Sequence, residues 1–236
     1  MKKFLLFVCF TLATMLLTGC VSGPMTAQDL FDRHISESYG PNGLTTHSSV
    51  TLKGQLNIAA FGITAPVTLR QMAPDSTSMV TQVMGTKLSN GCRAGDCWAQ
   101  QPGQAVETLD GERLKMQLQQ ADYYQLTHMA DFYQSLEIVA AVDGTESDNH
   151  HVLATRENGS EDSYFFSKES GFLVSTVLNT ITPQGTVAIT TNSSNFQDYD
   201  GIKLAAEIEQ VTPQVTVKIV IEDVSFAELS AADFVQ

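Results

Sequence analysis

The chain has 236 residues, and 26 acidic against 13 basic side chains give it a formal net charge of −13. An acidic chain without a basic stripe argues against nucleic-acid binding and against electrostatic docking on anionic lipid. Beyond the first twenty residues, no apolar run approaches the length of a membrane-spanning helix.

The first residues have the layout of a secretory signal. Lys2 and Lys3 precede an apolar run over residues 4–17, and small residues follow that run. A basic start, a short apolar stretch and a small-residue exit are typical of a segment that is removed after export. The run is too short to span a bilayer comfortably. We therefore expect residues 1–19 to be a cleaved signal peptide.

The residues Leu17-Thr18-Gly19-Cys20 resemble the bacterial lipobox, in which a cysteine receives a lipid on its sulfur and the chain is cut just before it. The alternative is an ordinary signal peptide with a chance cysteine. The resemblance implies lipidation of Cys20, a lipidated tether over residues 20–25 and stable anchoring, because several acyl chains hold a protein on its membrane. Val21 is not the Asp that retains enteric lipoproteins at the inner membrane, so the resemblance implies an outer-membrane address facing the periplasm.

A helix is expected directly after the tether. Thr26 can cap it, and Asp29 stands three residues later, where a capping box needs an acceptor. Leu30 and Ile35 fall on one side, and Gly40-Pro41 end the helix.

Strands follow. Alternation of apolar and polar residues from Val50 to Ala60 predicts a half-buried strand. Two further strands are expected at 65–72 and 78–88, with a turn at Pro74-Asp75 between the first and second of these. Residues 90–98 are expected to form a tight connection.

The composition becomes helical from Leu109 to Tyr133, and breaks at Asp122 and Asp131 predict two short helices there. Asn158-Gly159 then gives a strong hairpin signal between strands. The remaining strands are expected at 135–142, 149–157, 160–168, 172–182, 185–199, 202–208 and 215–221.

This order of elements predicts an α+β fold in one domain over residues 26–236, with one large antiparallel sheet. Helices are few, so such a sheet can curl around them and leave a cavity or a groove.

Several segments resemble the superfamily of outer-membrane lipoprotein-sorting (LolA/LolB-like) domains: SYGPNGL, VTLKG, GDCWAQ, DYDGIKL, VTVKIVIEDV and the closing ADF. The resemblance covers most of residues 26–236. It implies a curved antiparallel half-barrel, with the N-terminal helix and the helical insert as a lid on its concave face. It also implies a hydrophobic cavity for acyl chains and no catalytic residues.

Two cysteines remain after the signal and the lipid site. Cys92 and Cys97 are an even pair in an exported chain, so a disulfide is expected, with Arg-Ala-Gly-Asp as turn material between them. Metal or redox chemistry is the alternative, but a redox pair has two intervening residues rather than four.

The inward strand faces are the expected ligand site, with the insert from Leu114 to Met129 over it. For any single residue, ordinary core packing is the competing interpretation; the cavity depends mainly on the resemblance. The predicted ligand-binding residues are Val50, Leu52, Leu56, Ile58, Ile202, Leu204, Ile208, Val217 and Ile219.

No motif for catalysis, a cofactor or a nucleotide occurs in the sequence, so we expect neither an enzyme nor a cofactor. Asp148, His150 and His151 come nearest to a metal site. Adjacent strand residues point to opposite faces, so we expect no metal there.

The sequence therefore predicts a membrane-anchored lipoprotein that binds a lipid or an acylated protein for transport or localisation in the envelope. The alternative is a scaffold or stress-sensing module on the same fold, with a filled concavity. Phe61 and Ile63 stand at an expected hairpin tip, where they either fold back on the body or touch a bilayer or a lipidated client.

Overall fold

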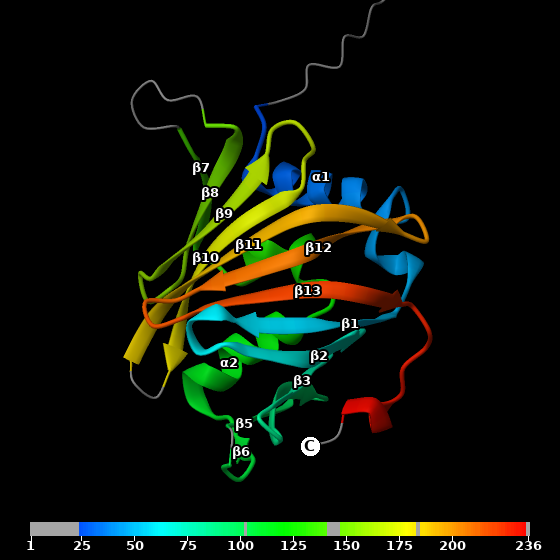
Figure 1. The fold of residues 1–236 in the computed structure, drawn as a ribbon. Helices are drawn as coiled ribbons and strands as arrows, with labels where there is room; N and C mark the ends of the chain where they lie inside the picture. Colours follow the sequence, from blue (N-terminus) through cyan, green and yellow to red (C-terminus); the bar gives the residue numbers. More distant parts are fainter. Residues whose placement is uncertain (1–23, 102, 141–146, 183–184, 235–236) are drawn as a thin grey trace, which may run out of the picture.

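The structure is a computed structural model that describes residues 24–101, 103–140, 147–182 and 185–234. Thirteen strands form one antiparallel sheet in the order β6-β5-β4-β3-β2-β1-β13-β12-β11-β10-β9-β8-β7. Because β6 and β7 are its two edges, the sheet is open, and Figure 1 shows it curved around the helices. The strands are β1 (Ser49–Ile58), β2 (Ile63–Met72), β3 (Ser76–Val83), β4 (Thr86–Arg93), β5 (Asp96–Gln100), β6 (Glu107–Thr108), β7 (Ser135–Val139), β8 (Asn149–Thr155), β9 (Glu161–Ser167), β10 (Leu173–Thr182), β11 (Gly185–Tyr199), β12 (Ile202–Val211) and β13 (Thr216–Ser225). The predicted α+β class is confirmed.

Helix α1 (Ala27–Tyr39) begins as the sequence predicts. The Thr26 hydroxyl accepts the N–H of Asp29, and the Asp29 carboxylate accepts the N–H of Thr26, which completes a capping box. Leu30 and Phe31 are buried against the inner face of β7 to β9, where the Phe31 ring meets Tyr164 edge-on. The helix thereby covers one end of the concave side (Figure 1).

Helix α2 (Gly111–Ala121) is the first of the two helices expected in the insert, and it lies on the concave side. The second is replaced by two 3-10 turns, η3 (Gln125–Thr127) and η4 (Met129–Asp131). The expectation of a second helix is therefore wrong. The Asp122 carboxylate accepts the N–H of Tyr124 at 2.9 Å, a local bond that competes with continued helix. Within the described ranges, no helix is long and apolar enough to cross a membrane.

The single strand expected at 78–88 is wrong, because the chain reverses in the middle of it. Met84 and Gly85 both have positive φ, at 51° and 80°, and they form the turn between β3 and β4. This conformation suits a two-residue hairpin, but methionine gives no sequence signal for it. Residues 90–98, expected to form one tight connection, instead form the end of β4, a two-residue turn at Ala94-Gly95 and the start of β5.

The C-terminal strap, residues 226–234, crosses the outer face of the sheet and ends in the 3-10 turn η5 (Ala231–Phe234). The Phe226 ring stacks on His47 at 4.3 Å, and the Ser49 hydroxyl donates to the Ala227 carbonyl at 3.0 Å. Phe234 is fully buried, and η5 contacts β3 and β4. The two faces are therefore covered differently: helices on the inside, the strap on part of the outside.

Candidate functional site

The concave side carries an apolar surface at the middle of the sheet, which we call the apolar concave face. Its residues are paired across neighbouring strands: Leu56 pairs with Ala65 on one side and with Ile219 on the other, and Ile219 pairs with Ile208. Paired residues of antiparallel strands share a face, so these side chains meet. The face comprises the buried Leu56, Val67, Ile219 and Ile221 and the partly buried Leu52, Ile58, Leu69, Met79, Ile208, Val217 and Val224.

The apolar concave face contains most of the predicted ligand-binding residues. Leu52, Leu56, Ile58, Ile208, Val217 and Ile219 are brought together there. The other three lie outside this cluster: Ile202 is buried, and Val50 and Leu204 are partly buried.

Gly54 allows the two halves of this face to join. The pairing of β1 with β13 shifts register between Lys53 and Gly54, and a Cβ at Gly54 would collide with the Val220 carbonyl. Only glycine permits this close approach of the two backbones. The bulge brings Leu56 into register with Ile219 and keeps the apolar face continuous across the β1–β13 junction.

Helix α2 covers the concave side by packing on the disulfide. Cys92 and Cys97 form a disulfide between paired residues of β4 and β5, as the sequence predicts, and both are fully buried. Leu114, Leu118 and Ala121 of α2 pack against it. The buried disulfide therefore provides the apolar surface on which the helix packs, and its sulfurs are shielded from solvent.

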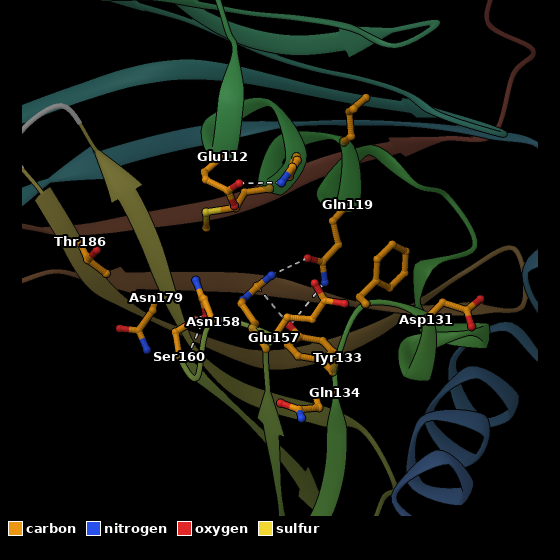
Figure 2. A pocket seen from close by; sticks show the side chains of 15 residues that line it. Glu112, Gln119, Asp131, Tyr133, Gln134, Glu157, Asn158, Ser160, Asn179 and Thr186 are labelled. Atoms are coloured by element: carbon orange, nitrogen blue, oxygen red, sulfur yellow. Dashed lines mark hydrogen bonds and ion pairs between the residues drawn. The ribbon is translucent and has the colours of Figure 1, made fainter.

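Beside α2 lies a polar cleft of about 1000 Å³. Figure 2 shows it between α2, the segment from η4 to β7 and the turn between β8 and β9. None of the nine predicted ligand-binding residues lines it. Its walls mix amides, charged groups and a few apolar side chains: Glu112, Lys115, Met116, Leu118, Gln119, Asp131, Phe132, Tyr133, Gln134, Arg156, Glu157, Asn158, Ser160, Asn179 and Thr186.

A network of buried polar groups forms one wall of this cleft. Arg156 makes an ion pair with Asp162, whose side chain has no exposed surface, and donates to the Gln119 amide oxygen at 2.9 Å. Tyr133 donates its hydroxyl proton to Asp162 at 2.7 Å, so Tyr164, 2.7 Å from the Tyr133 oxygen, is the donor of that second bond. Gln119 belongs to α2, so the network ties the helix to strand β9 and to the turn between β8 and β9.

The tyrosine hydroxyls in this network stay protonated. Burial, with Asp162 nearby, raises the pKa of Tyr133 to about 12, and burial together with Tyr133 also raises the pKa of Tyr164 above its ordinary value. Both groups therefore act as donors at neutral pH. The Asn179 N–H also donates to Asp162, at 2.9 Å, which leaves this carboxylate well solvated by protein groups.

Sequence reasoning missed this network, although part of its signal is present. Asp162, Tyr164 and Phe166 alternate along β9 on its inner face, so a carboxylate occupies a core position. Arg156 stands across the Asn158-Gly159 turn, which the structure places between β8 and β9 as predicted. Asp162 at a core position, with Arg156 six residues before it, was the available sequence signal for a buried ion pair.

The hairpin tip between β1 and β2 exposes the side chain of Phe61 to solvent. Phe61 ends the 3-10 turn η2 (Ala59–Phe61) and is 67% exposed, and Ile63 is partly buried. The interpretation in which Phe61 folds back on the body is therefore wrong. A shallow depression of about 450 Å³ lies beside this tip, against the β12–β13 turn.

His150 and His151 point to opposite faces of the sheet, as the sequence predicts for adjacent residues of a strand. His150 and His151 of β8 pair with Phe166 and Phe165 and so occupy opposite faces. His151 stacks on Phe165 at 4.5 Å and shares a hydrogen bond with Ser163. In the part of the chain that the structure describes, no group of three or more His, Cys, Asp or Glu side chains could hold a metal ion.

The comparisons with known proteins identify the fold. No protein-family model matches the chain, and no curated protein matches it. Among solved structures, a LolA superfamily protein from Nitrosomonas europaea is similar with a TM-score of 0.56 and 11% identity, over 90% of this chain and 98% of that one. A DUF1329 family protein from Desulfovibrio piger is similar with a TM-score of 0.53 and 15% identity, over 88% of this chain and 95% of the other. The open antiparallel sheet with its N-terminal helix is therefore a LolA-like fold, as the sequence resemblance predicted.

Proposed function

We propose that this protein is a membrane-anchored envelope lipoprotein that binds a lipid or a protein-linked acyl group, without catalysing a reaction. The observation that carries the proposal is the apolar concave face of an open sheet, in which Leu52, Ile58, Ile208 and Val217 remain partly exposed. Apolar surface left accessible on a concave side is suited to acyl chains, and its burial contributes about 25 cal/mol per Å². The role is carriage or localisation of such groups in the envelope.

Strand β13 offers a matched test of acyl binding. Val217 belongs to the apolar concave face, whereas Val220 is on the opposite face and is 36% exposed. Val217→Gln should weaken saturable binding of a fluorescent fatty acid about tenfold, since a polar amide replaces apolar contact surface. Val220→Gln should leave binding unchanged. Equal effects of the two changes, or no saturable binding by the unmodified protein, would contradict the proposal.

The anchor is proposed on the sequence alone, because Cys20 and the signal lie outside the described residues. Signal cleavage after Gly19 and lipidation of Cys20 would leave the domain of residues 26–236 on a short tether at the outer membrane. Cys20→Ala should abolish labelling by a fatty-acid probe and release the protein or leave its signal uncut. Unchanged labelling of the variant would refute the lipobox interpretation.

A scaffold or sensor role is the second candidate, and one observation favours it. The side chains of the apolar concave face pack on one another, and charged groups and amides interrupt the apolar lining of the large cleft beside α2. A concavity filled by its own side chains would present surfaces to proteins rather than a cavity to lipids. Native mass spectrometry of the purified protein separates the two roles, since a carrier retains bound lipid and a scaffold does not.

A further inference from the structure

The polar cleft has the size of a small-molecule site but not the character of an acyl site. Its volume of about 1000 Å³ is in the range of ligand pockets. Its lining is mixed: apolar atoms, among them those of Met116, Leu118 and Phe132, expose about as much surface as the polar atoms, and amides and charged groups interrupt that apolar surface. Figure 2 shows Gln119, Gln134 and Asn158 around the open space. An occupant must therefore satisfy polar side chains.

The charges around the cleft disfavour an anion. Lys115 is 2.6 Å from Glu112, and Arg156 is paired with the buried Asp162, so both cations are already neutralised. Asp131 and Glu157 line the cleft and are exposed, and the structure gives neither an ion-pair partner among the described residues. A phosphate or carboxylate entering here would meet two acids and no unpaired base.

Hydrogen-bonding capacity remains unused in the cleft. Within the described ranges, the Gln134 side-chain amide makes no hydrogen bond, and Asn158 uses only its oxygen, which accepts from Ser160 at 2.9 Å and 2.7 Å. Arg156 Nε also has no partner in the same part of the chain, but it is buried and closed to an occupant. The unused groups that an occupant can reach are the Asn158 amide N–H groups, which donate, and the Gln134 amide, which both donates and accepts.

This combination matches one ligand chemistry. A sugar presents neighbouring hydroxyls that each donate and accept, so they satisfy side-chain amides, and its C–H face can rest on an apolar or aromatic side chain such as Phe132. We propose that the polar cleft binds a neutral saccharide, either a free oligosaccharide or the sugar headgroup of a glycolipid. The site is distinct from the apolar concave face and does not depend on acyl binding.

The test uses the full-length protein in a polyoxyethylene detergent, which carries no sugar. Titration calorimetry with neutral trisaccharides of glucose, galactose, mannose or N-acetylglucosamine should find at least one saturable ligand. Its sulfated counterpart should bind about tenfold more weakly, because of Asp131 and Glu157. A glycolipid with the same sugar then distinguishes the sources: equal affinity identifies the free sugar as sufficient, and tighter binding identifies the lipid-linked form.

Two variants locate the binding. Gln134→Ala removes an amide that has no structural bond, and Asn158→Asp keeps the oxygen that holds Ser160 while removing the donor. Each should weaken binding several-fold, whereas Gln82→Ala, an exposed change on β3, should not. The proposal is overturned if no neutral trisaccharide binds saturably, if sulfated sugar binds more tightly, or if binding survives both variants unchanged.

Discussion

Asp162 is a charged side chain in a core position, and its partners determine what its loss would cost. It pairs with Arg156 and accepts bonds from Tyr133 and the Asn179 backbone. Removing one member of a buried pair leaves the other charge uncompensated. We expect Arg156→Met to lower the free energy of unfolding by about 3–5 kcal/mol, measured by urea denaturation.

The double change Arg156→Met with Asp162→Leu should cost less than the sum of the single changes, because no lone charge remains buried. Lys115→Met is the control, since it breaks a solvent-exposed pair with Glu112 and should leave the free energy of unfolding almost unchanged. Additive costs for the Arg156 and Asp162 changes would show that the pair is not coupled.

His34 gives stability a pH dependence. Burial lowers the pKa of His34 to about 4 from its ordinary 6.5, and its Nδ1 accepts the N–H of Leu173 at 3.1 Å. The unfolded chain therefore binds a proton at a higher pH than the folded chain. Stability should be full above pH 6.5 and fall progressively as the pH drops to about 4, by up to about 3 kcal/mol.

His34→Asn keeps an acceptor for the Leu173 N–H but does not titrate in this range, so its stability should decline less between pH 6.5 and 4. The measurement is urea denaturation of both proteins across that interval. Parallel curves for the two proteins would show that His34 contributes nothing to the dependence.

Helix α2 depends on a disulfide that closes only a short turn. Loop-closure entropy alone gives the bond about 2 kcal/mol. The cystine also supports Leu114 and Leu118, so its loss removes packing as well. Cys92→Ala with Cys97→Ala should lower the melting temperature and speed amide hydrogen exchange in α2 more than in α1. If the melting temperature fell while amide exchange in α2 stayed unchanged, the disulfide would stabilise the protein without supporting the helix.

Across the whole molecule, the predictable parts are those specified by neighbouring residues. The Thr26–Asp29 cap and the Asn158-Gly159 turn are local, and period-two alternation was enough to bring Leu56 and Ile219 to one face. The Met84 turn was missed because methionine rarely has positive φ.

The polar cleft could not be predicted, because its walls come from segments that only the sheet topology brings together. Gln119 and Arg156 are 37 residues apart and lie on different elements, yet they share a hydrogen bond. Hydrophobic periodicity reports which face a residue occupies and carries no information on which distant polar group it meets.

The C-terminal strap ties the end of the chain to the outer face of the sheet. Ser49, which bonds Ala227, shares that face with Thr51, and the pairing continues from Thr51 through β2, β3 and β4 to Trp98. Trp98 is buried, and it is the one tryptophan of the chain. Because η5 contacts β4, whose Gly91 pairs with Trp98, we expect Trp98 fluorescence to change when the strap leaves the sheet.

We expect Phe234 to be the main residue that anchors the strap on the sheet. It is fully buried, so Phe234→Ala should weaken the packing of the strap on the sheet by about 3 kcal/mol. Because a terminal segment can detach while the sheet persists, we expect Trp98 emission to shift to longer wavelength at urea concentrations below the main transition. Glu228→Ala, an exposed change in the same strap, should leave the emission unchanged. A single transition in Phe234→Ala, with Trp98 emission and circular dichroism changing together, would mean that the strap unfolds only with the sheet.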